Sequence, residues 1–411
     1  MVSMRSASRL LTAAVWCCLA TFVLVAIVVP TVVRYQLVLR KGSLPYSSYV
    51  APPIVSKMRI FVFHVANMAD YDSSDENFVP QFEEIGPIVY NMTRLRKNVK
   101  QNGRFITSQV LDTYKYNAEL SAIDEEHLVS TVNLKNYVAS LARKKPLLDT
   151  IKLRALLWDP DVGLLKDAGD QLQKPVTVNS GTLNPLSVYK ILDIDGKIKG
   201  PFGNGCNRFD GSYEGVGFSP LPYDVKLYFE PFGRNIDLTW TNYRYGVAKY
   251  LFDKDSFNMK LKKNKCYNQL EKYDGAMQLP DIDSNMNPAL ISFPHFLYSK
   301  DKRLTEIIGM HPDKGKHIGF FDIEPMSGVP TAGAIRLQIN ILSNHDTVLP
   351  VIWTEITFEL DEDMKTKLKF VHFLLLVLPV TVSGCFICVL IAYLCHVHRI
   401  YQRRKVGYVM M

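Results

Sequence analysis

Two long stretches of apolar residues lie near the ends of the chain, and shorter apolar runs alternate with polar residues between them. Residues 10–33 contain no charged side chain, and residues 371–395 contain no acid, lysine or arginine. A helix of either stretch is about 35 Å long, and the hydrocarbon layer of a bilayer is ~30 Å thick. The pattern therefore predicts two transmembrane helices, over 10–33 and 371–395.

The first stretch has an alternative interpretation as a cleaved signal peptide. The apolar core of such a peptide has about 7–15 residues and is followed by small residues at the cleavage site. Residues 10–33 are longer, and they end in Val-Val-Pro-Thr-Val-Val before Arg34. We therefore favour a retained membrane anchor.

The charges beside the second stretch indicate the orientation of the chain. A cluster of basic residues over 399–405 follows that stretch, and basic residues beside a span stay on the cytosolic side. Two spans place both termini on one side of the membrane. We expect a cytosolic tail over 1–9, a luminal or extracellular domain over 34–370, and a cytosolic tail over 396–411.

The central region consists mainly of short runs rich in β-branched and aromatic residues, separated by Gly, Pro and Asn. The expected strands are Met58–Val65, Ile88–Tyr90, Arg104–Leu111, Tyr114–Leu120, Val188–Ile194, Val225–Glu230, Tyr245–Phe252, Ile318–Ile323, Ile335–Leu342 and Val348–Phe358. Strands at this spacing, without helices between them, predict a closed or nearly closed antiparallel sheet.

Residues 125–158 are the exception to the strand pattern. Apolar residues recur there at helical spacing on both sides of Pro146. The segment predicts two helices joined by the basic residues Arg143, Lys144 and Lys145. The expected fold class is therefore α+β.

The charge balance narrows the classes of partner. The chain has 48 Lys and Arg against 40 Asp and Glu, and six of the basic residues lie outside residues 34–370. The central region therefore has a net charge of only +2, which gives no support to a nucleic-acid partner. Because 47% of the residues are hydrophobic, the chain can bury a sizeable core, which excludes intrinsic disorder.

Cysteine usage agrees with a domain on the oxidising side of a membrane. Five of the seven cysteines lie in the predicted spans, which leaves Cys206 and Cys266 in the central domain. We expect these two residues to form a disulfide bond, the alternative being two buried thiols. Asn91-Met92-Thr93 is a glycosylation sequon and predicts a glycan on Asn91.

Catalytic and metal-binding patterns are poor. The sequence contains no His-Glu-x-x-His, Gly-x-Ser-x-Gly or Walker motif. Residues 281–285 begin like a calcium loop, but Met286 stands where that loop requires glycine. No motif fixes an acid or a nucleophile near His295. We therefore expect no enzymatic activity, no cofactor and no metal site.

Several motifs occur in an order that is similar to that of a known family. The motifs are FVFHVAN at 61–67, EIGPIVY at 84–90, LRALLW at 153–158, SG at 180–181, FPHFLY at 293–298, FDIEPMSG at 321–328, RLQIN at 336–340 and LPVIW at 349–353. The series resembles the class B scavenger receptors, the family of fatty-acid translocase and the lysosomal integral membrane protein. The resemblance covers nearly the whole chain, including both predicted spans.

The resemblance implies an antiparallel β-barrel ectodomain with a helical bundle at its apex, anchored by two transmembrane helices. It also implies a lipid-lined tunnel toward the membrane and binding of lipids, lipoproteins or other anionic ligands without covalent chemistry. Arg143, Lys144 and Lys145 fall on the family's basic apex, where such ligands or a protein partner are captured. The alternative for these three residues is a solvated turn.

The cysteines both follow and depart from the family pattern. Cys206 and Cys266 match two luminal cysteines that we expect to pair, whereas the two other disulfides of the vertebrate pattern are absent. Residues 158–163 also depart from the family's usual sequence. The identity of the ligand therefore does not follow from the resemblance.

The end of the chain carries a candidate sorting signal. Tyr408 and Met411 are the fixed positions of a Tyr-x-x-Φ motif, in which Φ is a bulky apolar residue. Sorting adaptors read such signals as extended peptides through side-chain pockets. The motif predicts endosomal or lysosomal sorting, with a chance match as the alternative. We expect residence in the plasma membrane, in the endosomal-lysosomal membrane or in both, and the sequence leaves these possibilities open.

Two other classes of membrane protein stay open. A two-span ion channel subunit would share the topology, but neither span contains an acidic residue that could select a cation. A subunit that chaperones a membrane transporter is the other alternative. Saturable uptake of lipid or lipoprotein distinguishes a receptor from a channel, which requires ligand-gated current.

Overall fold

The computed structural model of the chain describes residues 4–72, 75, 77–141, 145–200, 208–222, 225–229, 233–267, 273–279, 289–343 and 347–409. The chain divides into two compact units. One unit combines residues 1–38 with residues 361–411, and the other comprises residues 39–360. The second unit corresponds to most of the predicted central domain.

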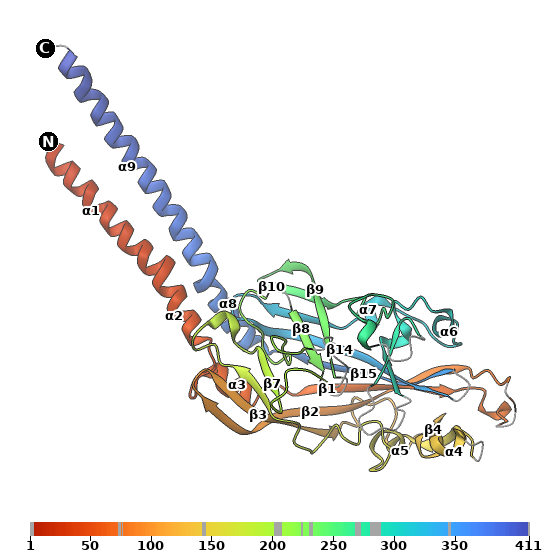
Figure 1. Ribbon diagram of the computed structural model, residues 1–411. Coiled ribbons are helices and arrows are strands. Elements are labelled where there is room, and N and C mark those ends of the chain that lie inside the picture. Colours follow the sequence, from red (N-terminus) through yellow and green to blue (C-terminus); the bar gives the residue numbers. More distant parts are fainter. Residues whose placement is uncertain are drawn as a thin grey trace. The chain divides into compact units, whose positions relative to one another are not determined.

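The first unit consists of two long apolar helical segments. Its elements are α1 Met4–Val23, the π-helical η1 Leu24–Val28, α2 Val29–Gln36, α8 Glu362–His372, the π-helical η8 Phe373–Val377 and α9 Leu378–Val409. Thr12–Gln36 and Glu362–Ile400 are long and apolar enough to cross a membrane, in agreement with the two predicted spans. Phe22 stacks on Phe386 with ring centroids 4.9 Å apart, so α1 and α9 pack side by side (Figure 1).

Each apolar segment contains a π-helical turn shortly before a proline. η1 ends two residues before Pro30, and η8 ends two residues before Pro379. Proline has no N–H to donate to the carbonyl four residues earlier, and its ring clashes with that carbonyl. These carbonyls belong to Ala26 and Leu375, which lie inside the π turns, so the wider turn accommodates the ring.

The second unit is built on one mostly antiparallel sheet. Its main path follows the order β7-β6-β3-β2-β1-β15-β14-β13-β10-β9-β8, and β12 pairs with β14 and β11. Figure 1 shows the central strands β3, β2, β1, β15 and β14 side by side. The strands are β1 Ser56–Val65, β2 Phe82–Asn102, β3 Phe105–Tyr116, β6 Val176–Asn179, β7 Ile191–Ile194, β8 Val225–Phe229, β9 Arg234–Arg244, β10 Val247–Phe252, β11 Ala276–Gln278, β12 Ala289–Ser292, β13 Phe320–Glu324, β14 Val329–Leu342 and β15 Val348–Glu359. The predicted antiparallel sheet is confirmed, whereas β6, β9, β11 and β12 were not predicted.

The strands β7 and β8 form the two edges of the sheet, and the ladders of the described strands do not close into a barrel. The segment 211–213 hydrogen bonds to both edges. Ile191 N–H donates to the carbonyl of Ser212 at 2.8 Å, and Tyr213 N–H donates to the carbonyl of Lys226 at 2.8 Å. The predicted closed barrel is therefore not confirmed as a continuous ladder.

The helices of the second unit are short. They are α3 Leu44–Val50, α4 Tyr137–Leu141, α5 Leu153–Trp158, α6 Lys302–Thr305 and α7 Lys314–His317, with 3₁₀ turns η2 Met68–Asp70, η3 Leu134–Asn136, η4 Pro185–Ser187, η6 Lys265–Tyr267 and η7 Pro294–Phe296. The longest of these described helices, α3, has seven residues. The predicted helical bundle is thus not confirmed in the part of the domain that the structure describes.

Residues 125–158 differ from the predicted pair of helices. β4 Leu128–Val132 pairs antiparallel with β5 Leu148–Lys152, with Val129 opposite Ile151. Both strands contain several valine, threonine and isoleucine residues, and such β-branched residues favour a strand. The spacing of the apolar residues in this segment also fits a helix, which is why a helix was predicted. The prediction is wrong for these two strands and correct for the helical segments α4 and α5.

Buried apolar side chains form two clusters in the second unit. One cluster includes residues of β6 to β10 and of β13, together with Tyr49 of α3. The other joins β1, β2 and β15 to β4, β5 and α5. Ile339 of β14 packs against both clusters, so β14 connects the two halves of the core.

Candidate functional site

The predicted basic turn is only partly described. Lys145 is exposed between α4 and β5, whereas Arg143 and Lys144 lie outside the described residues. The exposure of Lys145 fits both ligand capture and a solvated turn. The role of the three residues therefore stays a prediction.

The predicted disulfide and glycosylation site are not tested by the structure. Cys206 lies outside the described residues, and Cys266 belongs to η6. Asn91 is half-buried on β2, and its Oδ1 accepts a hydrogen bond from Asn117 Nδ2 at 3.2 Å. Both modifications stay predictions.

The candidate sorting signal lies at the end of α9. Tyr408 belongs to the last helical turn, and Met411 lies outside the described residues. A helical Tyr408 is not in the extended form that an adaptor reads. Binding of an adaptor would therefore require the last turn of α9 to unwind.

The best-defined polar site brings together residues from distant motifs. Glu84 lies on β2, His295 in η7 and Trp353 on β15. His295 Nε2 lies 2.6 Å from Glu84 Oε2, and Trp353 Nε1 donates to the same oxygen at 2.7 Å. No sequence motif indicated an acid beside His295. In the structure the acid is Glu84, which is 211 residues away in the sequence. We call Glu84, His295, Trp353 and the adjacent His317 the Glu84 cluster.

The register of the sheet explains this meeting. Glu84 pairs with Phe63 of β1, and Trp353 pairs with Phe61 of the same strand. The Phe61 and Trp353 rings stack with centroids 4.1 Å apart. A single strand therefore positions the carboxylate and the indole that meet at His295.

Each of the two histidines accepts a backbone hydrogen bond on its Nδ1, and this fixes which ring nitrogen carries the hydrogen. His311 N–H donates to His295 Nδ1 at 3.1 Å, and Asp313 N–H donates to His317 Nδ1 at 2.9 Å. Each neutral ring therefore carries its hydrogen on Nε2. The ligand atoms of Glu84, His295 and His317 lie within 4.8 Å of one another. However, a metal ion needs a nitrogen lone pair, so this geometry favours a hydrogen-bonded carboxylate over a metal centre.

Unusual backbone conformations hold His295 in place. His295, Phe296 and Tyr298 have φ angles of 52°, 54° and 69°. This left-handed region costs a residue other than glycine roughly 1–2 kcal/mol. Gln338 Oε1 accepts the His295 N–H at 2.6 Å, and Gln338 Nε2 donates to Asn340 Oδ1 at 2.6 Å. These buried amides stabilise the strained turn.

The electrostatics of the Glu84 cluster follow from burial and hydrogen bonding. Burial opposes the charge of Glu84, but the hydrogen bonds from His295 and Trp353 outweigh burial and hold the pKa of Glu84 below its usual value. Burial and the neighbouring His295 lower the pKa of His317 to about 4. At neutral pH the cluster therefore holds a carboxylate beside a neutral His317.

We expect the stability of the domain to fall as the pH falls from about 6.5 to about 4. The unfolded chain binds a proton on His317 near pH 6.5, whereas the folded chain binds it only near pH 4. Between these values the unfolded state holds more protons, which costs on the order of 2 kcal/mol of stability by about pH 4.5. The measurement is the melting temperature of the full chain in detergent at both pH values.

A matched pair of variants tests the origin of this dependence. His317→Gln should reduce the difference between the two melting temperatures, because the group that titrates is removed. His127→Gln changes an exposed histidine and should leave the difference as in the wild type. An undiminished difference in the His317→Gln variant would contradict the assignment.

A second buried polar group lies on β2 and β3. The Arg96 guanidinium is fully buried and donates to Glu214 Oε2 at 2.9 Å, to Ser108 Oγ at 3.1 Å and to the carbonyl of Tyr49 at 3.2 Å. It also lies over the Tyr49 ring, 3.9 Å from the centroid. Two positions earlier, Arg94 makes two hydrogen bonds to Asp112, at 2.8 and 2.7 Å. Paired charges therefore stand beside the first apolar cluster, to which Tyr49 belongs.

An open depression of ≈ 750 Å³ lies beside the Glu84 cluster. Besides Glu84 and His295, its lining includes Glu83, Asp313 and Lys316. Side chains of both charges suit this depression to water or a small polar group. An acyl chain would instead require an apolar lining.

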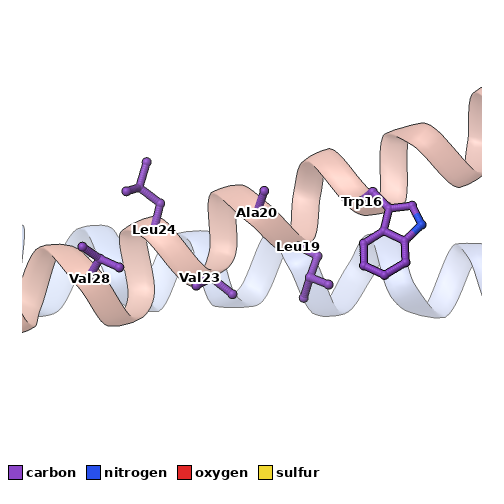
Figure 2. Close-up of a pocket in the computed structure, with 6 residues that line it drawn as sticks. All are labelled: Trp16, Leu19, Ala20, Val23, Leu24 and Val28. Carbon is purple, nitrogen blue, oxygen red and sulfur yellow. The ribbon is translucent and has the colours of Figure 1, made fainter.

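The first apolar segment carries a groove of a different kind. Figure 2 shows its lining along α1 and η1: Trp16, Leu19, Ala20, Val23, Leu24 and Val28. Spacings of three and four residues place such side chains along one face of a helix. This uniformly apolar face suits contact with the acyl chains of a bilayer.

Sequence reasoning missed the roles of Glu84, His317, Gln338 and Arg96. One signal was available, because Gln338 and Asn340 interrupt an apolar strand at alternate positions, and amides on a buried face need partners. The partners themselves lie far away in the sequence. Only the sheet register brings them together.

Comparison with known proteins places these features in a family. The profile of the CD36 family matches residues 9–158 and 142–400. Lysosome membrane protein 2 of Rattus norvegicus is 24% identical over 400 residues, and that of Homo sapiens is 24% identical over 398 residues, with 82% of each chain covered. Sensory neuron membrane protein 1 of Apis mellifera is 22% identical over 424 residues, which cover 82% of this chain and 80% of the relative.

Proposed function

The chain belongs to the CD36 family, and on this premise we propose that it is a membrane-anchored class B scavenger receptor for lipids, lipoproteins or other anionic ligands. The observation that carries the proposal is the family match across the central domain and most of both apolar segments. The proposed activity is binding and transfer of hydrophobic ligand toward the membrane. It involves no covalent chemistry and no cofactor.

The proposed path of the ligand runs through the interior of the sheet. The segment 211–213 hydrogen bonds to both β7 and β8, which supports closure of the sheet around the first apolar cluster. A long-chain lipid that stays out of water avoids a cost of about 0.8 kcal/mol per methylene. A closed, apolar interior would therefore give such a lipid a favourable route.

The proposed residence is the endosomal and lysosomal membrane, besides the plasma membrane. The names of the relatives refer to lysosomal and sensory neuron membranes. The Tyr408-x-x-Met411 motif supports sorting by an adaptor on the cytosolic side. In this arrangement both termini are cytosolic.

Saturable uptake tests the proposed function. Cells that express the full chain at their surface should take up fluorescent lipoprotein or anionic phospholipid vesicles, and the rate should saturate with ligand concentration. The control is the same cell line without the expressed chain. Uptake that stays at the level of the control cells at verified surface expression would contradict the proposal.

The basic turn gives a more specific prediction. Replacing Arg143, Lys144 and Lys145 together by Gln should weaken binding of anionic vesicles roughly hundredfold, since three basic residues near such a surface contribute about 1 kcal/mol each. The dependence of binding on salt should flatten as well. Folding should be spared, because exposed charges seldom contribute more than ~1 kcal/mol each.

A control variant separates a local effect from a loss of net charge. Lys254, Lys262 and Lys265 are exposed, and their replacement by Gln removes the same charge elsewhere in the domain. This control should bind vesicles as the wild type does. Equal affinity and equal salt dependence in both triple variants and the wild type would show that residues 143–145 form only a solvated turn.

A further inference from the structure

The hairpin of β9 and β10 ends in an exposed aromatic tip. Trp240, Tyr243 and Tyr245 expose 56%, 46% and 95% of their surface. Buried and half-buried residues alternate along the first half of β9, whereas every residue from 239 to 244 is exposed. β8 pairs with β9 only as far as Leu238. In the described sheet, the tip therefore extends beyond the packed core.

The turn of this hairpin has an unusual sequence for its conformation. Arg244 pairs with Val247, and the two residues between them, Tyr245 and Gly246, have φ angles of 52° and 83°. A two-residue turn with both φ angles positive strongly prefers Asn, Asp or Gly at its first position. A bulky aromatic residue is strained there. Because Tyr245 is almost fully exposed, burial within the domain does not offset this strain.

The register of the sheet defines the edge at which the tip lies. Lys249 pairs with Asp322, Asp322 with Ala332, and Ala332 with Glu359. The hairpin tip is therefore displaced from Lys249 in the direction in which β15 runs toward its end. Leu360 is the last residue of the unit, and the apolar segment Glu362–Ile400 begins two residues later. The tip thus lies at the edge of the sheet where the chain leaves for the second span.

We propose that the hairpin tip, formed by Trp240, Tyr243, Arg244 and Tyr245, inserts into the headgroup region of the phospholipid bilayer that anchors the chain. Tryptophan and tyrosine concentrate at this interface, because an apolar ring and a polar N–H or O–H meet both of its phases. The guanidinium of Arg244 matches the phosphate of a lipid headgroup. Residues 239–247 contain no acid that would oppose this contact.

The inference uses only the membrane anchoring of the chain. It does not require that the domain transfers lipid, so either proposal can fail without the other. Its consequence is an attachment of the domain to the bilayer in addition to the two spans, which restricts the tilt of the sheet edge near the second span. Transfer of a lipid from this edge would then occur over a short distance.

Tryptophan quenching in the full chain tests the insertion. The chain contains four tryptophans, and the difference between the wild type and Trp240→Phe isolates the emission of Trp240. The probe is a vesicle of phosphatidylcholine whose acyl chains carry bromine close to the headgroups. In these vesicles the Trp240 emission should lose most of its intensity relative to unbrominated vesicles. Trp158→Phe is the control, since the emission of Trp158, half-buried in the domain, should be equal in both lipids.

The opposite pattern would overturn the proposal. If Trp240 emission is equal in brominated and unbrominated vesicles and is quenched instead by aqueous iodide, the tip faces water. If neither reagent quenches it, the tip is covered by protein, as in a second copy of the chain or another partner. Both results exclude insertion of the hairpin into lipid.

The strained residue offers a second test. Tyr245→Asn should raise the melting temperature of the full chain in detergent, because Asn adopts positive φ more readily. The same change should decrease the quenching of Trp240 by brominated lipid, because an aromatic anchor is lost. A raised melting temperature with unchanged quenching would overturn the role of Tyr245 in membrane contact.

Discussion

Replacing Glu214 by Ala should destabilise the central domain by about 3–5 kcal/mol, because it leaves the buried Arg96 guanidinium without its counter-charge. Arg96 is fully buried, so water cannot compensate for the lost carboxylate. Arg96 would still donate hydrogen bonds to Ser108 Oγ and to the Tyr49 carbonyl, but these acceptors are neutral and do not balance the positive charge of the guanidinium. The measurement is the denaturant dependence of unfolding of the full chain in detergent.

A double variant separates the loss of the pair from the loss of packing. Arg96→Met together with Glu214→Ala removes both charges and leaves an apolar side chain at the buried position. Replacement of a buried ion pair by apolar residues is often neutral, so the double variant should recover most of the lost stability. If it is as unstable as Glu214→Ala alone, the uncompensated charge is not the cause.

Replacing Gln338 by Leu should cost about 2–5 kcal/mol, since two buried polar groups lose their partners. The His295 N–H loses its acceptor, and Asn340 Oδ1 loses its donor. Without these bonds the left-handed conformation of residues 295–298 is no longer held, and His295 moves away from Glu84. The pH dependence of stability that we assign to His317 should change in parallel, because the two histidine rings stack 4.5 Å apart.

The control for this variant is an exposed amide. Gln171→Leu introduces the same change at an exposed position and should alter stability by less than about 0.5 kcal/mol. Similar losses in both variants would show that added apolar surface is the cause. Wild-type stability in Gln338→Leu would mean that the strained turn is held by other contacts.

The parts of the fold that could be predicted depend on local sequence. A span needs only a continuous apolar run, and most strands need only a short β-branched or aromatic run between turn residues. The segment 128–152 shows the limit of such reasoning, because its apolar spacing fits a helix and a strand equally well. Only pairing between β4 and β5 decides between them.

The candidate sites could not be predicted, because their partners meet through the sheet. In β2, Leu95 stands between Arg94 and Arg96. This alternation of polar and apolar residues predicts an arginine that faces solvent and a leucine that is buried. The structure shows the reverse, with Arg96 more deeply buried than Leu95. A fully buried arginine is rarely found without a paired group, and the carboxylate of Glu214 comes from 118 residues away. These partners are therefore brought together by the register of the sheet, which the local sequence does not determine.

Transfer of a lipid into a bilayer by the reconstituted full chain is the most direct test of the proposed receptor function. Vesicles that contain the protein and a lipid-bound energy acceptor are mixed with donor particles that carry a fluorescent long-chain lipid. The initial rate of energy transfer should rise with protein density and saturate with donor concentration. The triple variant of residues 143–145 should require more donor to reach the same rate. A rate equal to that of protein-free vesicles, or one that rises linearly with donor without saturation, would contradict the proposed function.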